Sequence, residues 1–193
     1  MVSNSLSNRL TQKIQPVPFA LHIQVARHMN STDWALAILA VIAVLLAGAQ
    51  YMEHILLLDP CPLCMMQRLW LIQIGMVACL GIATNSRLRI YPLLSIVGAG
   101  IGGGFSIRQL YLQSLPADQV PLCGPDLAYM LDVFPLSDTL NAMIMGGGSC
   151  AQVDWSFLGL SIAAYALLGF ILLAGLSVAQ WKASTIPHQV SKS

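Results

Sequence analysis

Two of the five cysteines in this 193-residue chain form a C-x-x-C motif, Cys61-Pro62-Leu63-Cys64. Closing such a short ring removes little entropy from the unfolded chain, so the motif would make a poor structural staple. It would make a good redox centre, because both thiols stay adjacent after reduction. Pro62 suits the first position of a helix, which would place Cys64 in the first turn, where the helix dipole favours a thiolate.

Arg68 follows Cys64 by four residues and would lie one turn further along the same helix face. A cation at this place can stabilise a thiolate or hold the carbonyl oxygen of a molecule beside it. The alternative is a structural arginine that reaches the lipid headgroups from the end of a membrane span. The neighbouring C-x-x-C motif favours the first interpretation.

The other cysteines are Cys79, Cys123 and Cys150. Cys79 lies fifteen positions beyond Cys64, about 22 Å along a helix, so we expect a buried apolar residue that cannot reach the others. The remaining four divide into Cys61–Cys64 and Cys123–Cys150, and two dithiol pairs can relay electrons by thiol–disulfide exchange. Two alternatives stay open: a four-thiolate zinc site, which the spacing disfavours, and a purely structural Cys123–Cys150 disulfide.

A dithiol relay needs a final electron acceptor. The sequence has neither a C-x-x-C-H haem motif nor an iron–sulfur run. The stretch Gly98-Ala99-Gly100-Ile101-Gly102-Gly103 matches the dinucleotide pattern G-x-G-x-x-G, but it lies inside an apolar stretch with no strand before it. The pairs Gly98/Gly102 and Gly100/Gly104 are instead typical of faces on which membrane helices pack closely.

A quinone dissolved in lipid, ubiquinone or menaquinone, would need only a groove beside the C-x-x-C motif. Cys64 could then donate electrons from the membrane edge, and Arg68 could hold a quinone carbonyl. The residues alone therefore favour a quinone as the acceptor.

The composition sets the class of protein in which this chemistry must take place. Hydrophobic residues make up 56% of the chain and charged residues 9%, where about 25% is usual, and the net charge is +1. So few charges cannot supply the shell of a soluble enzyme, and the balance excludes a nucleic-acid binder. The mean hydropathy of +0.72 indicates an integral membrane protein.

Four charge-free apolar stretches are long enough to cross a bilayer as helices: residues 34–52, 69–86, 90–107 and 155–181. They predict an all-α membrane protein, a four-transmembrane-helix bundle spanning residues 34–181. Loops 53–68 and 109–154 would lie on the periplasmic side, and an N-terminal arm, 1–33, and a tail, 182–193, in the cytoplasm. Within the long loop between the third and fourth helices, residues 127–145 form either a surface amphipathic helix or an irregular loop. Gly146–Gly148 should be mobile.

The charges are sorted by side, and this predicts the orientation. Seven of the nine basic residues fall on the side of the two termini: Arg9, Lys13, Arg27, Arg87, Arg89, Lys182 and Lys192. Seven of the eight acids fall on the opposite side: Glu53, Asp59, Asp118, Asp126, Asp132, Asp138 and Asp154. The positive side should be cytoplasmic.

Two features leave the N-terminus open. Ala47-Gly48-Ala49 resembles a signal-peptidase site, although the preceding arm is long for a signal peptide. Met29, which directly precedes the first span, is an alternative start to Met1.

The segment Cys61-Pro62-Leu63-Cys64-Met65-Met66-Gln67-Arg68 resembles the C-x-x-C-x3-R motif of the disulfide bond formation protein B (DsbB) family, membrane thiol oxidases. Arg108-Gln109-Leu110, the two loop cysteines and the run from Asp154 to Leu160 resemble the same family, in the same order. The resemblance extends from about Trp34 to Gln180.

This resemblance implies a location and a role for each site residue. The chain would lie in the bacterial inner membrane and reoxidise a periplasmic DsbA-like dithiol oxidase. Cys123 would form the mixed disulfide with that partner, and Cys150 would be its pair. Cys61 would be the sulfur attacked when the loop pair is reoxidised, and the Cys64 thiolate would pass electrons to quinone beside Arg68.

Two other functions remain as alternatives. One is a vitamin K epoxide reductase-like enzyme, in which the loop cysteines precede the C-x-x-C motif, whereas here they follow it. The other is a non-enzymatic membrane scaffold with one structural disulfide, which would tolerate replacement of Cys61, Cys64 and Arg68.

Overall fold

The computed structural model describes residues 30–84, 88–116, 118–120, 129, 132–153 and 155–184. Cys123, and with it the predicted Cys123–Cys150 pair, lies outside these residues, as do the tail beyond residue 184 and most of the N-terminal arm. The elements in chain order are α3 (Ser31–His54), α4 (Pro62–Ala83), α5 (Ile90–Ser114), α7 (Leu136–Met145), α8 (Gly148–Ala151), β1 (Ser156–Phe157), β2 (Leu160–Ser161) and α9 (Ile162–Ala183).

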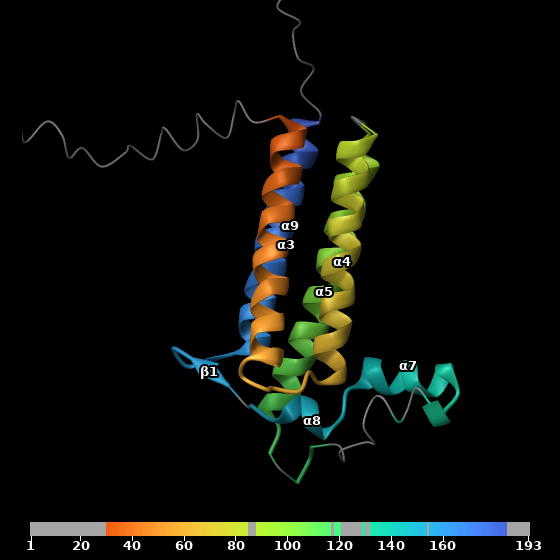
Figure 1. Cartoon of the computed structure of the whole chain (residues 1–193), viewed down its shortest axis with the longest axis vertical. Coiled ribbons are helices and arrows are strands. Elements are labelled where there is room, and N and C mark those ends of the chain that lie inside the picture. Colours follow the sequence, from red (N-terminus) through yellow and green to blue (C-terminus); the bar gives the residue numbers. More distant parts are fainter. Residues whose placement is uncertain are drawn as a thin grey trace, which may run out of the picture.

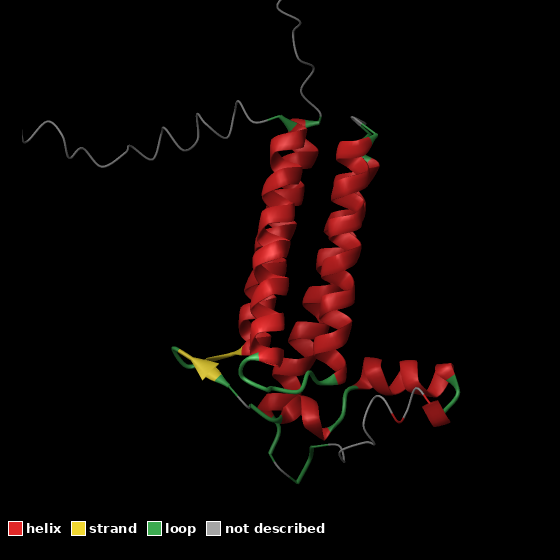
Figure 2. Cartoon of the chain, in the orientation of Figure 1, coloured by secondary structure: helices red, strands yellow, loops and turns green. Residues whose placement is uncertain are grey.

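Within this described part, four helices are long and apolar enough to cross a membrane: α3, α4, α5 and α9. The four spans expected from the sequence are thus present as helices, in an all-α architecture (Figure 2). Helix α5 packs against both α4 and α9, and α3 packs against the same two helices. One end of the bundle holds the start of α3, the end of α4, the start of α5 and the end of α9 (Figure 1). The other end carries α7, α8 and the small hairpin.

The helix bounds differ from the predicted stretches most clearly at three places. Helix α4 begins at Pro62, so it includes the last part of the predicted loop 53–68 and starts before the predicted stretch 69–86. Helix α5 continues past Arg108 to Ser114, because a charged residue at a span end need not end the helix. The fourth helix begins at Ile162 and not at Trp155. Residues 156–161 instead form an antiparallel β1–β2 hairpin. Its turn residues Leu158 and Gly159 have φ angles of 51° and 78°, which a helix cannot accommodate.

Glycines let the helices approach closely at the bundle centre. A Cβ atom on Gly102 would collide with the ring of the buried Phe170 on α9, and one on Gly98 would lie 3.0 Å from Cγ1 of Ile74 on α4. This confirms a close-packing face at Gly98/Gly102. The same prediction for Gly100 and Gly104 is wrong, since nothing lies within 4 Å of a Cβ at either position.

Cys79 also differs from expectation. We expected it to be buried, but it is exposed on the outside of α4. It lies in the last turns of α4 (Pro62–Ala83), on an outer surface that contacts lipid, where a small apolar side chain needs no protein contact.

The connection between α5 and α9 is structured where it is described. The predicted amphipathic segment 127–145 contains α7, which covers only its last part, Leu136–Met145. The segment 146–148, expected to be mobile, is packed: Gly148 is buried, and a Cβ on Gly146 would lie 2.8 Å from Cδ1 of Leu63. Arg108 fastens this segment to α5, since its Nε and Nη2 donate to the Met145 carbonyl oxygen at 3.3 and 3.1 Å.

Candidate active site

The C-x-x-C motif begins helix α4. Cys61 is the N-cap residue and Pro62 occupies the first turn, as predicted from the proline. The Cys64 backbone N–H donates to the Cys61 Sγ at 3.4 Å, and the two Sγ atoms lie 2.9 Å apart. Both cysteines are free thiols, close enough for a small side-chain rotation to close a disulfide.

Cys150, which is distant in the sequence, packs against the same motif. It is fully buried in α8 and packs in a cluster with Cys61, Leu63 and Leu112. The hydrogen bond between the Cys61 and Cys150 side chains raises the pKa of the Cys61 thiol and lowers that of Cys150 to about 6. Cys61 thus shares contacts with two other sulfurs, and Cys150 is the more easily ionised of the Cys61–Cys150 pair.

Two buried glutamines complete the surroundings of the thiols. Gln109 on α5 donates from Nε2 to the Cys61 Sγ at 3.4 Å and to the Cys64 Sγ at 3.3 Å. Gln67 on α4 donates from its own Nε2 to the Gln109 Oε1 at 2.8 Å. Neither glutamine was identified as a site residue from the sequence. Their position in the sequence could have indicated them, because each glutamine stands next to an arginine, Arg68 or Arg108, at the polar end of an apolar helix.

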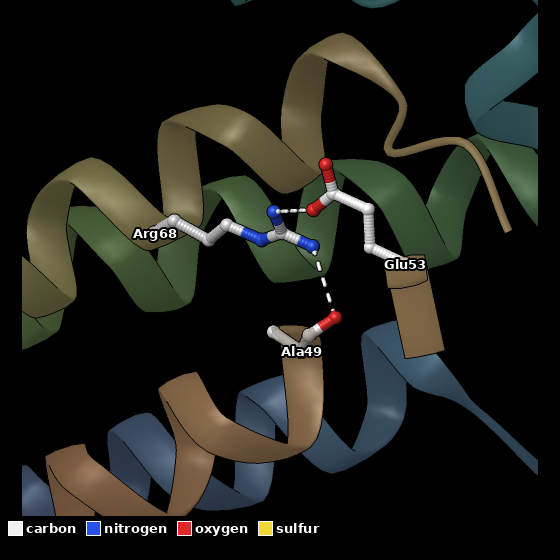
Figure 3. A network of polar contacts seen from close by, with 3 residues as sticks. All are labelled: Ala49, Glu53 and Arg68. Carbon is white, nitrogen blue, oxygen red and sulfur yellow. Dashed lines mark hydrogen bonds and ion pairs between the residues drawn. The ribbon is translucent and has the colours of Figure 1, made fainter. Parts of the chain in front are cut away.

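Arg68 lies one turn beyond Cys64 and forms an ion pair with Glu53 at the end of α3 (Figure 3). Its Nη2 also donates to the Ala49 carbonyl oxygen at 3.3 Å. The arginine is therefore held across the α3–α4 contact, instead of extending freely to solvent. The sequence placed Glu53 among the acids of this side, but it did not indicate the pairing.

A cavity of about 250 Å³ connects these groups. Side chains from the four long helices line it, and its walls are mainly apolar, including Leu45, Leu71 and Phe170. Cys64, Gln67 and Arg68 form a polar wall. The arrangement can place a flat apolar molecule beside a thiol and a guanidinium.

The structure therefore brings together Cys61, Cys64, Cys150 and Arg68 at one end of the bundle. Cys123 is the one predicted site residue for which it gives no position. The chemistry that the four placed residues support is exchange of disulfides between Cys150 and the C-x-x-C pair, next to a cavity with one cationic contact.

Comparison with known proteins gives a consistent result. The family model described as "Disulfide bond formation protein DsbB" matches residues 31–180. A disulfide bond formation protein B from Saccharophagus degradans is 44% identical over 149 residues, which is 76% of this chain and 90% of the relative. The one from Marinobacter nauticus is 50% identical over 136 residues, 69% of this chain and 81% of the relative.

A third relative, disulfide bond formation protein B of Hahella chejuensis, is 47% identical over 145 residues, 74% of this chain and 87% of the relative. The matched residues 31–180 include the C-x-x-C motif, α3, α4, α5 and all but the last turn of α9. They favour a disulfide-forming membrane oxidoreductase over the vitamin K epoxide reductase-like enzyme and the scaffold. With its thiols, cavity and helices arranged as described, the chain belongs to the DsbB family of disulfide bond formation proteins.

Proposed function

We propose that this protein oxidises the dithiol of a DsbA-like periplasmic partner and passes the two electrons to a membrane quinone. One observation carries the proposal: the Cys61 sulfur contacts both Cys64 and Cys150, while Cys64 and Arg68 line the same apolar cavity. A disulfide can therefore move from one cysteine pair to the other at the edge of a site for a flat apolar acceptor.

The first half of the reaction takes place at the loop pair. A thiolate of the partner attacks Cys123 of the Cys123–Cys150 disulfide, forms a mixed disulfide and releases Cys150 as a thiolate. The second partner thiol then displaces Cys123, so that the partner leaves oxidised. The assignment of Cys123 as the partner-facing sulfur rests on the family resemblance.

The second half takes place at the C-x-x-C pair. The Cys150 thiolate attacks the Cys61 sulfur, a Cys61–Cys150 bond forms, the Cys61–Cys64 bond breaks, and the electron pair stays on Cys64. The Cys123 thiolate then attacks Cys150, which re-forms the Cys123–Cys150 disulfide, breaks the Cys61–Cys150 bond and releases Cys61 as a thiolate. Cys61 and Cys64 close their own disulfide as their two electrons pass to the quinone. The two protons lost by the partner dithiol balance the two that quinol formation requires.

The cavity residues suit a quinone as substrate. The apolar walls match the ring and the start of an isoprenoid tail, and Arg68 can donate a hydrogen bond to a carbonyl oxygen, where negative charge develops on reduction. Glu53 and the Ala49 carbonyl hold the guanidinium at this wall. The chain's own residues thus bind and orient the acceptor next to the Cys64 sulfur.

We further propose that the protein spans the bacterial inner membrane several times with both termini in the cytoplasm. The basic residues Arg89 and Lys182 lie at one end of the bundle, whereas Glu53, Asp59 and the C-x-x-C motif lie at the other. The basic end is expected to face the cytoplasm. The thiols would then face the oxidising periplasm.

Quinone reduction by the purified protein, supplied with a reduced periplasmic dithiol protein, tests this function. We expect Cys64→Ser to abolish turnover and Arg68→Ala to raise the KM for quinone. Cys79→Ser is the matched control, because this exposed cysteine lies far from the cavity, and its turnover should equal that of the wild type. Equal turnover of Cys64→Ser and the wild type would refute the relay.

A trapping experiment tests the entry cysteine. In Cys150→Ala, supplied with the oxidised partner, the Cys123 thiolate should attack the partner's disulfide and hold it as a mixed disulfide, with the other partner sulfur released as a thiolate, because no Cys150 thiol remains to displace it. If the partner is instead trapped on Cys150 in Cys123→Ala, and none is trapped on Cys123 in Cys150→Ala, the roles of the two cysteines are reversed.

A further inference from the structure

The amide of Gln109 is the nearest hydrogen-bond donor on a neighbouring helix to both sulfurs of the C-x-x-C pair. Its Nε2 lies 3.4 Å from the Cys61 Sγ and 3.3 Å from the Cys64 Sγ. Only 4% of the Gln109 side chain is exposed, so it is removed from bulk water. Burying a polar group costs free energy unless its hydrogen bonds are satisfied. The two cysteine sulfurs are the acceptors that satisfy the NH2 group of Gln109.

Gln67 fixes which end of that amide faces the thiols. Its Nε2 donates to the Gln109 Oε1 at 2.8 Å, so the carbonyl end of Gln109 is occupied and the NH2 end points to the sulfurs. Gln67 is itself 5% exposed and lies one turn from Cys64 on α4. The two amides form a chain that runs from α4 to α5 and back to the C-x-x-C motif on α4.

We propose that Gln109, oriented by Gln67, stabilises the Cys64 thiolate and thereby raises the tendency of the Cys61–Cys64 disulfide to accept electrons. The direction of electron flow rests on the proposed function. When Cys150 attacks Cys61, the Cys61–Cys64 bond breaks and its electron pair remains on Cys64. The N–H···S contact strengthens as this charge develops, and no proton leaves the amide.

An amide is suited to this role because it does not titrate. A buried cation would itself change charge with pH or attract a counter-ion, whereas the Gln109 NH2 donates at every pH. Stabilisation of a reduced form makes a disulfide a stronger oxidant. Gln67 acts through Gln109 and is a positioning residue.

Other titratable groups line the same cavity or interact with Cys64, and the experiment must separate their effects. They come from each element around the cavity: Cys61 and Asp59 before α4, Arg68 on α4, Cys150 on α8 and Tyr165 on α9. A substitution at Gln109 leaves these groups in place, except that Cys150 is replaced by alanine in every variant compared. A change in thiol properties can therefore be attributed to the amide.

The experiment measures the equilibrium of the Cys61–Cys64 pair with a glutathione buffer, in the full-length chain carrying Cys123→Ala and Cys150→Ala. We expect Gln109→Met, which keeps the length but removes the donor, to shift the thiol–disulfide equilibrium toward the disulfide by roughly ten- to hundredfold, the usual effect of a hydrogen bond to a charged group. Gln109→Glu, which replaces the donor by an acceptor, should shift it further. Gln180→Leu, which removes a buried amide at the opposite end of α9, is the control and should leave it unchanged.

A second measurement follows the ionisation of Cys64 by NMR of cysteine labelled at Cβ. Gln109→Met should raise the Cys64 pKa, and Gln67→Leu should raise it less. The double variant should equal Gln109→Met alone, because Gln67 acts only through Gln109. Gln109→Asn, which keeps the amide but draws it back from the sulfurs, provides an intermediate value if Gln109→Met does not fold.

An unchanged equilibrium in folded Gln109→Met, or wild-type behaviour in Gln109→Glu, would overturn the proposal. Additive effects of Gln67→Leu and Gln109→Met would overturn the positioning role. Neither measurement uses a quinone. A wild-type protein that fails to reduce quinone but still shows the Gln109 shifts would therefore refute the proposed function and leave the thiolate stabilisation standing.

Discussion

At the residue scale, Cys61 is the sulfur through which both cysteine pairs meet. Its Sγ lies 2.9 Å from that of Cys64, and its side chain packs with Cys150 in one buried cluster. Both cysteines of the motif line the cavity, and Cys64 lies one helical turn from Arg68, which lines it too. This geometry suits Cys61 to exchange sulfur partners and Cys64 to release electrons.

The ionisation of Cys150 gives a prediction for the reduced protein. The hydrogen bond from Cys61 is the largest cause of its lowered pKa of about 6, against about 8.5 for an ordinary thiol. A lowered pKa means that the thiolate persists as the pH falls, so wild-type Cys150 should stay ionised at neutral pH. Cys61→Ala removes the donor and should raise the pKa toward the ordinary value, as measured by NMR of the labelled cysteine. Cys79→Ala should not move it, and an unmoved midpoint in Cys61→Ala would contradict the assignment.

The ion pair between Arg68 and Glu53 gives a second prediction. Both side chains are partly exposed, so water screens their attraction and the pair contributes little to the free energy of unfolding. Glu53→Gln should therefore leave the Tm nearly unchanged, but the guanidinium would lose its orientation. We expect the KM for quinone to rise by about two- to fivefold with kcat little changed. Asp138→Asn, an exposed acid on α7, is the control, and a lower KM in Glu53→Gln would mean that Glu53 competes with the quinone for Arg68.

At the scale of elements, the site depends on the contact of α8 with the first turn of α4. Gly146 makes this contact possible, because its φ is +73° and a Cβ would lie 2.8 Å from Cδ1 of Leu63 and 2.9 Å from Cδ1 of Leu112. Arg108 fixes the same segment through the Met145 carbonyl oxygen. The position of Cys150 therefore follows from the packing of the chain immediately before it.

Gly146→Ala tests this contact, and Gly159→Ala is its matched control. Both glycines have positive φ, +73° and +78°, so both substitutions strain the backbone by about 1–2 kcal/mol. A Cβ on Gly159 meets nothing within 4 Å, whereas one on Gly146 collides with Leu63. Only Gly146→Ala should slow disulfide exchange between Cys150 and Cys61, measured by rapid alkylation and mass spectrometry. Equal exchange rates in the two variants would show that α8 is positioned in another way.

At the scale of the whole molecule, the bundle presents apolar side chains outward along its length. Large hydrophobic residues exposed on the four long helices include Val44, Leu69, Met76, Val97, Ile107 and Ile171. In water such a surface would aggregate, whereas in a bilayer it contacts lipid. The start of α4, which carries the C-x-x-C motif, and helix α8, which carries Cys150, lie at one end of this apolar body (Figure 1).

Reporter fusions test the orientation of the molecule. Alkaline phosphatase, which is active only in the periplasm, should be active when fused after Leu115, because three helices precede that point. Fused after Ser184 it should be inactive, and a fluorescent protein at the same point should fluoresce. The reverse pattern would mean that the basic end at Arg89 and Lys182 faces the periplasm, contrary to the charge distribution.

Much of the candidate site could be predicted because its signals are local. The C-x-x-C spacing, the proline that starts α4 and the four-residue step to Arg68 are all fixed by helix geometry within one or two turns. The spans could be predicted because hydropathy over about 20 residues reflects the bilayer thickness. The error at residues 155–161 arose because an apolar hairpin and an apolar helix start have the same hydropathy.

The sequence by itself determined a membrane bundle with a redox-active C-x-x-C motif and an adjacent cation. Only the tertiary structure decided which distant groups meet there: Cys150 with Cys61, Glu53 with Arg68, and Gln67 with Gln109. Gln67 and Gln109 are 42 residues apart, and Glu53 and Arg68 are 15 apart on different helices. Such contacts depend on how the helices cross and which faces pack together. No local periodicity encodes those relations, so they follow only from the folded bundle.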